Sequence, residues 1–342
     1  MATDGGRTRT SRRRPRSADA ADPAGADGAT GDGGAPNSVT TATGTLRLPL
    51  ALGALGALAI AFSGIFVRLS TVAPATSAVF RCLYAVPVLA LLASREQRTS
   101  GPRGPADRRL SLAAGVAFAV DLVAWHYAIE VVGAGLATVL ANVQVVIVGL
   151  VAWLALGERP SRATVRAVPV MLFGVVLISG VIGADAYGDN PALGAALGLL
   201  AAAAYAGFLL LLRAGNRDRR HRAGALLDAT VVAGVGAAVA GLAFGNVDLV
   251  PSWPAHGWLL ALALNSQVLG WLLISYALPR LPAVMTSVLL LLQPVGAVLL
   301  GMLLLDEAPS LAQLGGVGLV LVGIVVATTG GATRGRRAAR AA

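Results

Sequence analysis

Two stretches of this chain repeat each other and decide its fold. Residues 136–174 read LATVLANVQVVIVGLVAWLALGERPSRATVRAVPVMLFG, and residues 285–323 read MTSVLLLLQPVGAVLLGMLLLDEAPSLAQLGGVGLVLVG. They align without a gap, so that Gln144 falls on Gln293. Over residues 132–180, 16 of 49 positions are identical to the matched copy, whereas this composition would give roughly six by chance. The chain is therefore an internal duplication, and we expect its function where the two halves meet.

The composition is that of a polytopic membrane protein. Of the 342 residues, 56% are hydrophobic and 13% are charged, whereas a soluble domain carries about 25% charged residues. The single cysteine excludes an internal disulfide framework and a cysteine metal cluster. All 27 basic residues are arginines, which excludes a Walker A loop and a lysine Schiff base, because both chemistries need lysine. We expect no cofactor and no metal site.

Apolar runs long enough to cross a membrane recur along the chain. Because a hydrocarbon layer of about 30 Å needs about 20 apolar residues per helix, the sequence predicts an all-α integral membrane protein with ten transmembrane helices. The predicted spans are 48–67, 74–93, 111–131, 135–156, 164–183, 192–212, 224–244, 257–278, 283–304 and 312–330. The expected organisation is a disordered basic tail at 1–45, five-helix repeats at 46–184 and 190–330, and a basic tail at 331–342.

The arginines predict the orientation. With the N-terminus in the cytoplasm, 25 of the 27 arginines fall in cytoplasmic segments, as the positive-inside rule requires. The net charge of +10 therefore reflects membrane orientation, and we expect a lipid bilayer and no nucleic acid as partner. Five spans per half place the halves in opposite orientations. A 5+5 inverted repeat in the cell membrane, with both termini cytoplasmic, places a substrate site near the midplane.

The sequence resembles the EamA family of the drug/metabolite transporter superfamily. The resemblance is carried by FAVDLVAWHYAIE (118–130), ATVLANVQVVIVGLVAWLALGERPS (137–161) and SQVLGWLLISYALPRLPAVMTSVLLLLQPVGAVLLGMLLLDEAPS (266–310), within a cover of about 46–330. It implies a ten-helix permease that exports or exchanges small metabolites without ATP. The family usually has proline after the residue at Gln144, as Pro294 follows Gln293, but this chain has Val145. The sequence thus gives no proline-based reason for a break in span 4.

Two charges lie inside predicted spans. Arg81 is eight residues into span 2 and Asp121 is ten residues from either end of span 3. Because such a charge costs about 2.5–3.5 kcal/mol on insertion scales, both are expected to face a cavity or a partner. Arg81 would bind an anionic group, with snorkelling to the surface as the alternative. Asp121 would bind an ammonium, pair with Arg81 or carry a coupling proton; the alternative is a buried carboxylate capped by hydroxyls or amides.

Two aromatic residues follow Asp121 on the same span. Trp125 lies one turn further on and would line the same face, unless it is an interfacial belt residue. His126 lies about 140° round the helix from Asp121, so the two do not face one narrow lumen squarely. His126 is a candidate for proton coupling, and the alternative is a contact with Glu130 one turn away.

Amides and one further tryptophan complete the candidate site. Gln144 and Gln293 are repeat-related and mid-span, and each would bind substrate or another helix. Asn142 is about 200° from Gln144 on a regular helix and is expected to face elsewhere. Gln267 and Trp271 share a predicted lumen stripe of span 8. The candidate substrate-binding residues are Arg81, Asp121, Trp125, Gln144, Gln267, Trp271 and Gln293.

Three function classes follow. The first is a secondary active transporter, an exporter of amino acids or related metabolites that works by alternating access. The second is a membrane-embedded enzyme such as a lipid-modifying transferase, which would need a convergent catalytic set that the short loops do not hold. The third is a structural membrane protein, which the midplane charges disfavour. We therefore expect a non-enzyme with a small-molecule substrate. A monomer and a homodimer both fit the sequence.

Overall fold

The protein is helical throughout its described part. The computed structural model describes residues 38–156, 162–182, 185–215, 220–250, 252–277, 280–281 and 289–341. The helices are α1 (Ser38–Ala61), α2 (Ser63–Ser70), α3 (Pro74–Ser100), α4 (Pro105–Val132), α5 (Ala134–Ala141), α6 (Gln144–Leu156), α7 (Arg162–Ile178), α8 (Pro191–Ala214), α9 (Arg222–Phe244), α10 (Ala255–Ala261), the π-helix η1 (Leu262–Gly270), α11 (Trp271–Ala277), α13 (Leu292–Leu304) and α14 (Leu311–Ala341).

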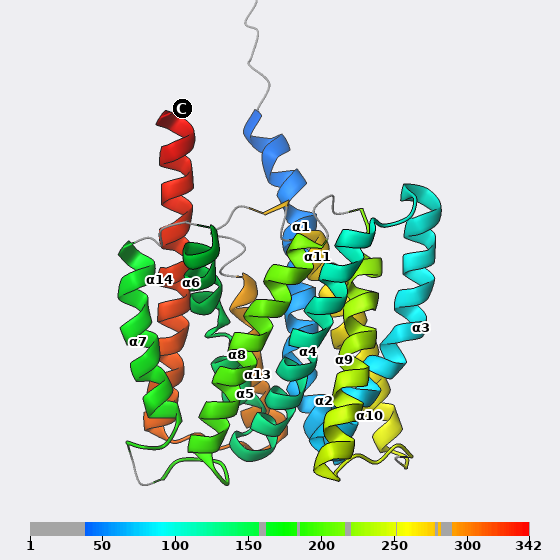
Figure 1. Ribbon diagram of the computed structural model, residues 1–342. Helices are drawn as coiled ribbons and strands as arrows, with labels where there is room; N and C mark the ends of the chain where they lie inside the picture. The colour runs from blue at the N-terminus through cyan, green and yellow to red at the C-terminus, as the bar shows by residue number, and fades with distance from the viewer. Residues whose placement is uncertain are drawn as a thin grey trace, which may run out of the picture.

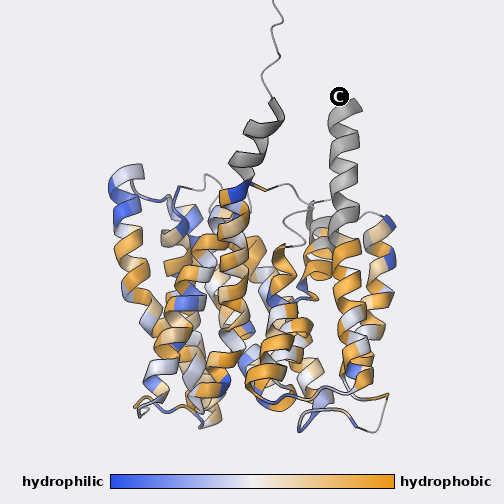
Figure 2. Cartoon of the chain, turned by 180° about the vertical axis from the view of Figure 1, so that it is seen from behind, coloured by the Kyte–Doolittle hydropathy of each residue, from blue (hydrophilic) through white to orange (hydrophobic). Residues whose placement is uncertain are grey.

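The helices have the length and surface of membrane spans. Within the described residues, six helical stretches are long and apolar enough to cross a membrane, and four shorter apolar helices accompany them. Large side chains that a soluble protein would bury point outward, such as Leu154 at 72% exposure and Leu303 at 76%. Apolar colour covers the sides of the bundle in Figure 2. The prediction of an all-α integral membrane protein is confirmed at this level.

The bundle is built from adjacent helices that run up and down. The start of α1 and the end of α14 lie at the same end of the bundle in Figure 1. Helix α4 packs against α8 and α9, α3 against α9, and α7 against α14. Small residues allow the last contact, because a Cβ on Gly174 would lie 2.7 Å from the backbone oxygen of Gly316. Close backbone approach at small residues is the usual way for helices to pack in lipid.

Three helical irregularities lie near the centre of the bundle. The backbone is interrupted between α5 and α6 at Asn142 and Val143 although no proline follows Gln144. Helix α13 begins at Leu292, next to Pro294. Helix η1 is a π-helix over nine residues, a form often found at functional sites. In contrast, Pro87 and Pro169 lie inside the continuous helices α3 and α7.

Two terminal helices extend beyond the predicted boundaries. Helix α1 begins at Ser38, within the tail that was expected to be disordered up to residue 45. Helix α14 continues to Ala341, through the segment expected to be a tail after residue 330. Because adding a residue to an existing helix is far easier than starting one, both spans continue beyond their apolar parts.

Glu307, in the connection between α13 and α14, caps a helix of the other half. Its carboxylate is 3% exposed and accepts hydrogen bonds from the backbone N–H groups of Ala134 (2.5 Å) and Gly135 (3.0 Å), at the start of α5. Burial raises the pKa of the Glu307 carboxyl, while the two N–H groups and Arg68 act in the opposite direction. Its repeat partner Glu158 lies outside the described residues.

Replacing Glu307 should destabilise the protein. Glu307→Ala leaves two buried N–H groups without acceptors, each worth about 1–3 kcal/mol, so we expect a lower melting temperature in detergent. Asp185→Ala, in the exposed loop after α7, should leave the melting temperature unchanged. Equal melting temperatures for Glu307→Ala and the control would show that the cap contributes no stability.

Candidate functional site

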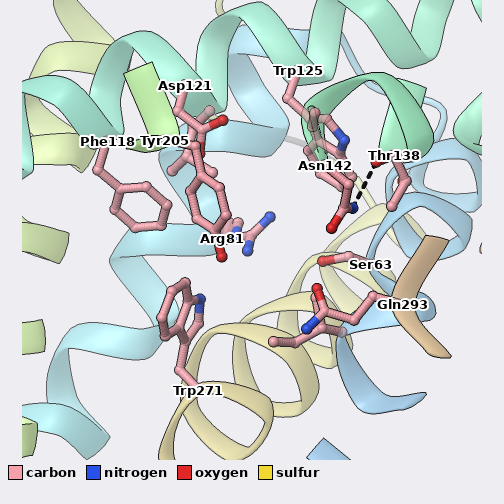
Figure 3. A pocket seen from close by; sticks show the side chains of 13 residues that line it. Ser63, Arg81, Phe118, Asp121, Trp125, Thr138, Asn142, Tyr205, Trp271 and Gln293 are labelled. Carbon is pink, nitrogen blue, oxygen red and sulfur yellow. Dashed lines mark hydrogen bonds between the residues drawn. The ribbon is translucent and has the colours of Figure 1, made fainter. Parts of the chain in front are cut away.

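A cavity lies in the middle of the bundle and holds most of the predicted site. Its empty volume is about 540 Å³, and α1, α2, α3, α4, α5, α8, α11 and α13 contribute to its wall. Figure 3 shows polar and aromatic side chains converging on it from both halves of the chain. The lining residues are Ile60, Ser63, Arg81, Phe118, Asp121, Leu122, Trp125, Thr138, Ala141, Asn142, Tyr205, Trp271 and Gln293.

The guanidinium of Arg81 is hydrogen-bonded through Nε, and its two terminal nitrogens are available to a ligand. Its side chain is 5% exposed, and its Nε donates to Oε1 of Gln267 at 2.9 Å. Gln267 is fully buried and in turn donates from Nε2 to Oγ1 of Thr230 at 3.1 Å. The guanidinium carbon lies 5.7 Å from the ring centroid of Trp125. Because no described residue accepts from the two terminal nitrogens, they are available to a carboxylate.

Asp121 faces the same cavity without a partner. Its side chain is 7% exposed, and no donor in the described part of the chain lies within hydrogen-bonding distance of it. Arg81 is not within the 4.0 Å that defines an ion pair, since the ion pairs found among the described residues involve only Asp228. The cavity therefore presents one cation and one anion on separate parts of its wall. A ligand that carries both charges would satisfy both groups.

Aromatic rings form the apolar part of the wall. Trp125 is 8% exposed and lines the cavity, so it is not an interfacial belt residue. Tyr205 and Trp271 lie edge to face with centroids 6.0 Å apart. Phe118, which the sequence analysis missed, stacks on Phe208 at 4.3 Å. Its position one turn before Asp121 on α4 is the signal that would have identified it.

The amide side chains that line the cavity differ from those that the sequence predicted. Gln293 lines the cavity and Gln267 lies behind Arg81, but Gln144, although buried, is not among the lining residues. Asn142, expected to face elsewhere, lines the cavity and donates from Nδ2 to the Thr138 oxygen at 2.8 Å. The reason is the interruption between α5 and α6, because the regular helical rotation used for that expectation does not hold across it.

His126 lies outside this cavity. Its Nδ1 is 2.6 Å from the Leu122 carbonyl oxygen, and its Nε2 is buried without a hydrogen-bond partner. The expected contact with Glu130 is not formed as a hydrogen bond or an ion pair among the described residues. His126 and Glu130 instead line a second hollow, nearer the end of the bundle.

Asp228 forms an ion pair away from the central cavity. Its carboxylate lies 2.6 Å from Nη1 of Arg103, on the segment before α4. The pairing depends on α4 and α9 being adjacent in the bundle, a contact that proximity in sequence does not reveal.

Comparisons with known proteins agree with this fold. The EamA-like transporter family matches twice, over residues 47–180 and 192–329. No curated protein matches the chain. Twenty-four chains of solved structures match the chain. One of them, described as "Crystal structure of protein", is 17% identical and covers 82% of this chain and 98% of its own, with a TM-score of 0.57. This similarity is one of fold alone. Because the two family matches together cover most of the sequence, the chain belongs to the EamA-like transporter family.

Proposed function

We propose that this protein is a secondary active transporter that exports small zwitterionic metabolites, amino acids or related compounds, across the cell membrane. The observation that carries the proposal is the central cavity, where Arg81 and Asp121 are both buried and Asp121 makes no hydrogen bond or ion pair with any described residue. Burying an unpaired charge is costly in a membrane protein. A substrate that neutralises both groups repays this cost, whereas a purely structural protein gains nothing from it. This is why a structural role is the weaker alternative.

The cavity chemistry specifies the substrate class. The terminal nitrogens of Arg81 would bind a carboxylate in two-pronged geometry, and Asp121 would bind an ammonium. Phe118, Tyr205 and Trp271 would enclose an apolar or aromatic side chain. An α-amino acid combines these three features in one small molecule.

The transport cycle we propose is alternating access in a 5+5 inverted repeat of ten spans. The support is the duplication in the sequence, the two family matches and a cavity whose wall draws on both halves. One half would rock against the other around the substrate. The wall of this cavity comes from one chain, so we propose that a single chain is the transport unit, as a monomer or within a homodimer.

The proposed orientation, with both termini cytoplasmic, can be tested by labelling. Cysteines introduced at Arg98 and at Asp185, both exposed, should react differently with an impermeant thiol reagent applied to intact cells. Labelling at Asp185 and protection at Arg98 is expected. Cys82 is buried and is replaced by alanine as a background. Labelling at Arg98 with protection at Asp185 would reverse the orientation.

The substrate class can be tested by counterflow in proteoliposomes. Vesicles loaded with L-phenylalanine should accumulate external radiolabelled L-phenylalanine, because exchange needs only one substrate site that faces both sides in turn. Phenethylamine lacks the carboxylate and 3-phenylpropionate lacks the ammonium, so each should compete at least tenfold more weakly than L-phenylalanine. Equal competition by all three molecules would show that the protein does not require a substrate with both a carboxylate and an ammonium group.

A further inference from the structure

A second hollow is lined by residues of α2, of the segment that joins α2 to α3, and of the end of α4. In Figure 1, α2 lies at the end of the bundle opposite the start of α1 and the end of α14. The second hollow has an empty volume of about 940 Å³, and Arg68, His126 and Glu130 belong to its lining. A smaller hollow of about 500 Å³ shares Arg68 and Glu130 and adds Asp189. We call the two together the distal hollow. It lies apart from the central cavity, with which it shares no lining residue.

Arg68 and Glu130 lie beside the distal hollow and do not contact each other. Both side chains are exposed, and neither makes an ion pair or a hydrogen bond with any described residue, since both ion pairs found in the described part of the chain involve Asp228. Arg68 acts on the Glu307 carboxyl through its charge alone, without direct contact. Opposite charges beside one hollow that do not contact each other leave room for a ligand between them. The wall of the hollow thus presents the cation of Arg68 and the anions of Glu130 and Asp189.

His126 adds a hydrogen-bonding atom without a partner. Its side chain is 1% exposed, and its Nε2 has no hydrogen-bond partner. Its Nδ1 lies 2.6 Å from the Leu122 carbonyl oxygen. Since a carbonyl oxygen can only accept, Nδ1 carries the hydrogen, and Nε2 of the neutral ring is an acceptor. Because Glu130 lies one turn further along α4, the imidazole and the carboxylate together suit the N–H groups of an ammonium.

The distal hollow and the central cavity lie along the same helices. On α4, Trp125 lines the cavity and the next residue, His126, lines the distal hollow. On α2, Ser63 lines the cavity and Arg68 lines the distal hollow. A substrate that leaves the cavity along α2 and α4 therefore reaches a second set of charges of the same kind.

We propose that Arg68, His126 and Glu130 form a second binding site for a small zwitterionic amino acid, which the substrate occupies between the central cavity and solution. Arg68 binds the carboxylate, and Glu130 with Nε2 of His126 binds the ammonium. The substrate class rests on the proposed function. The second site itself rests on the distal hollow, on the charges of Arg68 and Glu130 beside it, and on Nε2 of His126, which has no hydrogen-bond partner.

Binding stoichiometry separates the two sites. Equilibrium dialysis of the detergent-solubilised full chain with radiolabelled L-phenylalanine should give two bound equivalents per chain. Arg68→Gln should reduce the number to one, Asp121→Asn should reduce it to one, and the double variant should bind none. Arg98→Gln is the matched control, because Arg98 is an exposed arginine in the last turn of α3. This variant should still bind two equivalents per chain.

A local signal identifies which site is filled. The chain has three histidines, so ¹⁵N-histidine spectra are simple, and His126→Gln assigns the signal of interest. In the Asp121→Asn background, L-phenylalanine should shift the His126 signal, and adding Arg68→Gln should abolish that shift. Two equivalents in Arg68→Gln, or no shift in Asp121→Asn, would overturn the second site. One equivalent that Asp121→Asn keeps and Arg68→Gln loses would uphold it while overturning the central site.

Discussion

Asp121→Asn is expected to abolish transport, with substrate binding to the central cavity weakened by two to three orders of magnitude. The change removes the anion that faces the substrate ammonium. Breaking a buried charge pair costs about 3–5 kcal/mol, and each 1.4 kcal/mol is about tenfold in affinity. Since Asp121 has no hydrogen-bond partner to lose within the described chain, and its side chain is 7% exposed, the folded protein should tolerate the neutral amide.

Efflux of radiolabelled L-phenylalanine from proteoliposomes measures this effect at equal reconstituted amounts. Asp185→Asn, the same change in an exposed loop, serves as the matched control and should transport like the wild type. Wild-type efflux by Asp121→Asn would remove Asp121 from the site. Loss of proton-driven efflux with intact exchange would assign Asp121 to proton coupling instead.

Arg103→Ala is expected to cause the largest loss of stability among single changes at the end of the bundle where α4 begins. Arg103 is the centre of a polar cluster: it donates to Asp228 at 2.6 Å, to Ser111 at 2.5 Å and to the Gly215 oxygen at 3.2 Å. The side chains of Arg103 and Asp228 are only 6% and 14% exposed. Removing the cation leaves a buried carboxylate without its main partner, a change that costs about 3–5 kcal/mol.

The measurement is the melting temperature in detergent together with the yield of monodisperse protein. Arg98→Ala removes an exposed arginine of the same end and should have little effect, because exposed charges contribute about 0–1 kcal/mol. Asp228→Asn should fall between the two, since an amide still accepts a hydrogen bond from Arg103. A melting temperature of Arg103→Ala equal to that of Arg98→Ala would show that the cluster does not stabilise the fold.

Much of the architecture follows from patterns that do not depend on packing. The apolar runs predict where helices lie because every backbone N–H and C=O must be bonded within the segment in lipid. Their observed bounds agree with the predicted spans to within two residues in α8 and α9. The resemblance to the EamA family is confirmed over both halves. The helical continuation at Ser38 and at Ala341 was missed, since hydropathy reports the lipid layer rather than the end of a helix.

The composition of the site was predicted in part. Charges inside an apolar run mark functional candidates by their cost alone, and Arg81 and Asp121 indeed line one cavity. Which amides join them was not predictable, because rotation along a regular helix is lost at an interruption. The break after Ala141 brings Asn142 into the lining in place of Gln144, and no proline signals it.

The sequence by itself determined that the chain is helical, apolar and duplicated, and that two buried charges require an explanation. These properties depend on the free energy of transferring each residue from water to lipid and on the pattern of residues along the chain. Only the tertiary structure decided which groups meet: Arg81 with Gln267, Asp228 with Arg103, and Glu307 with the start of α5. Each contact joins residues more than a hundred positions apart. Such pairings follow from how helices pack, and in lipid that packing depends on shape and small residues rather than on hydrophobicity that a sequence profile reports.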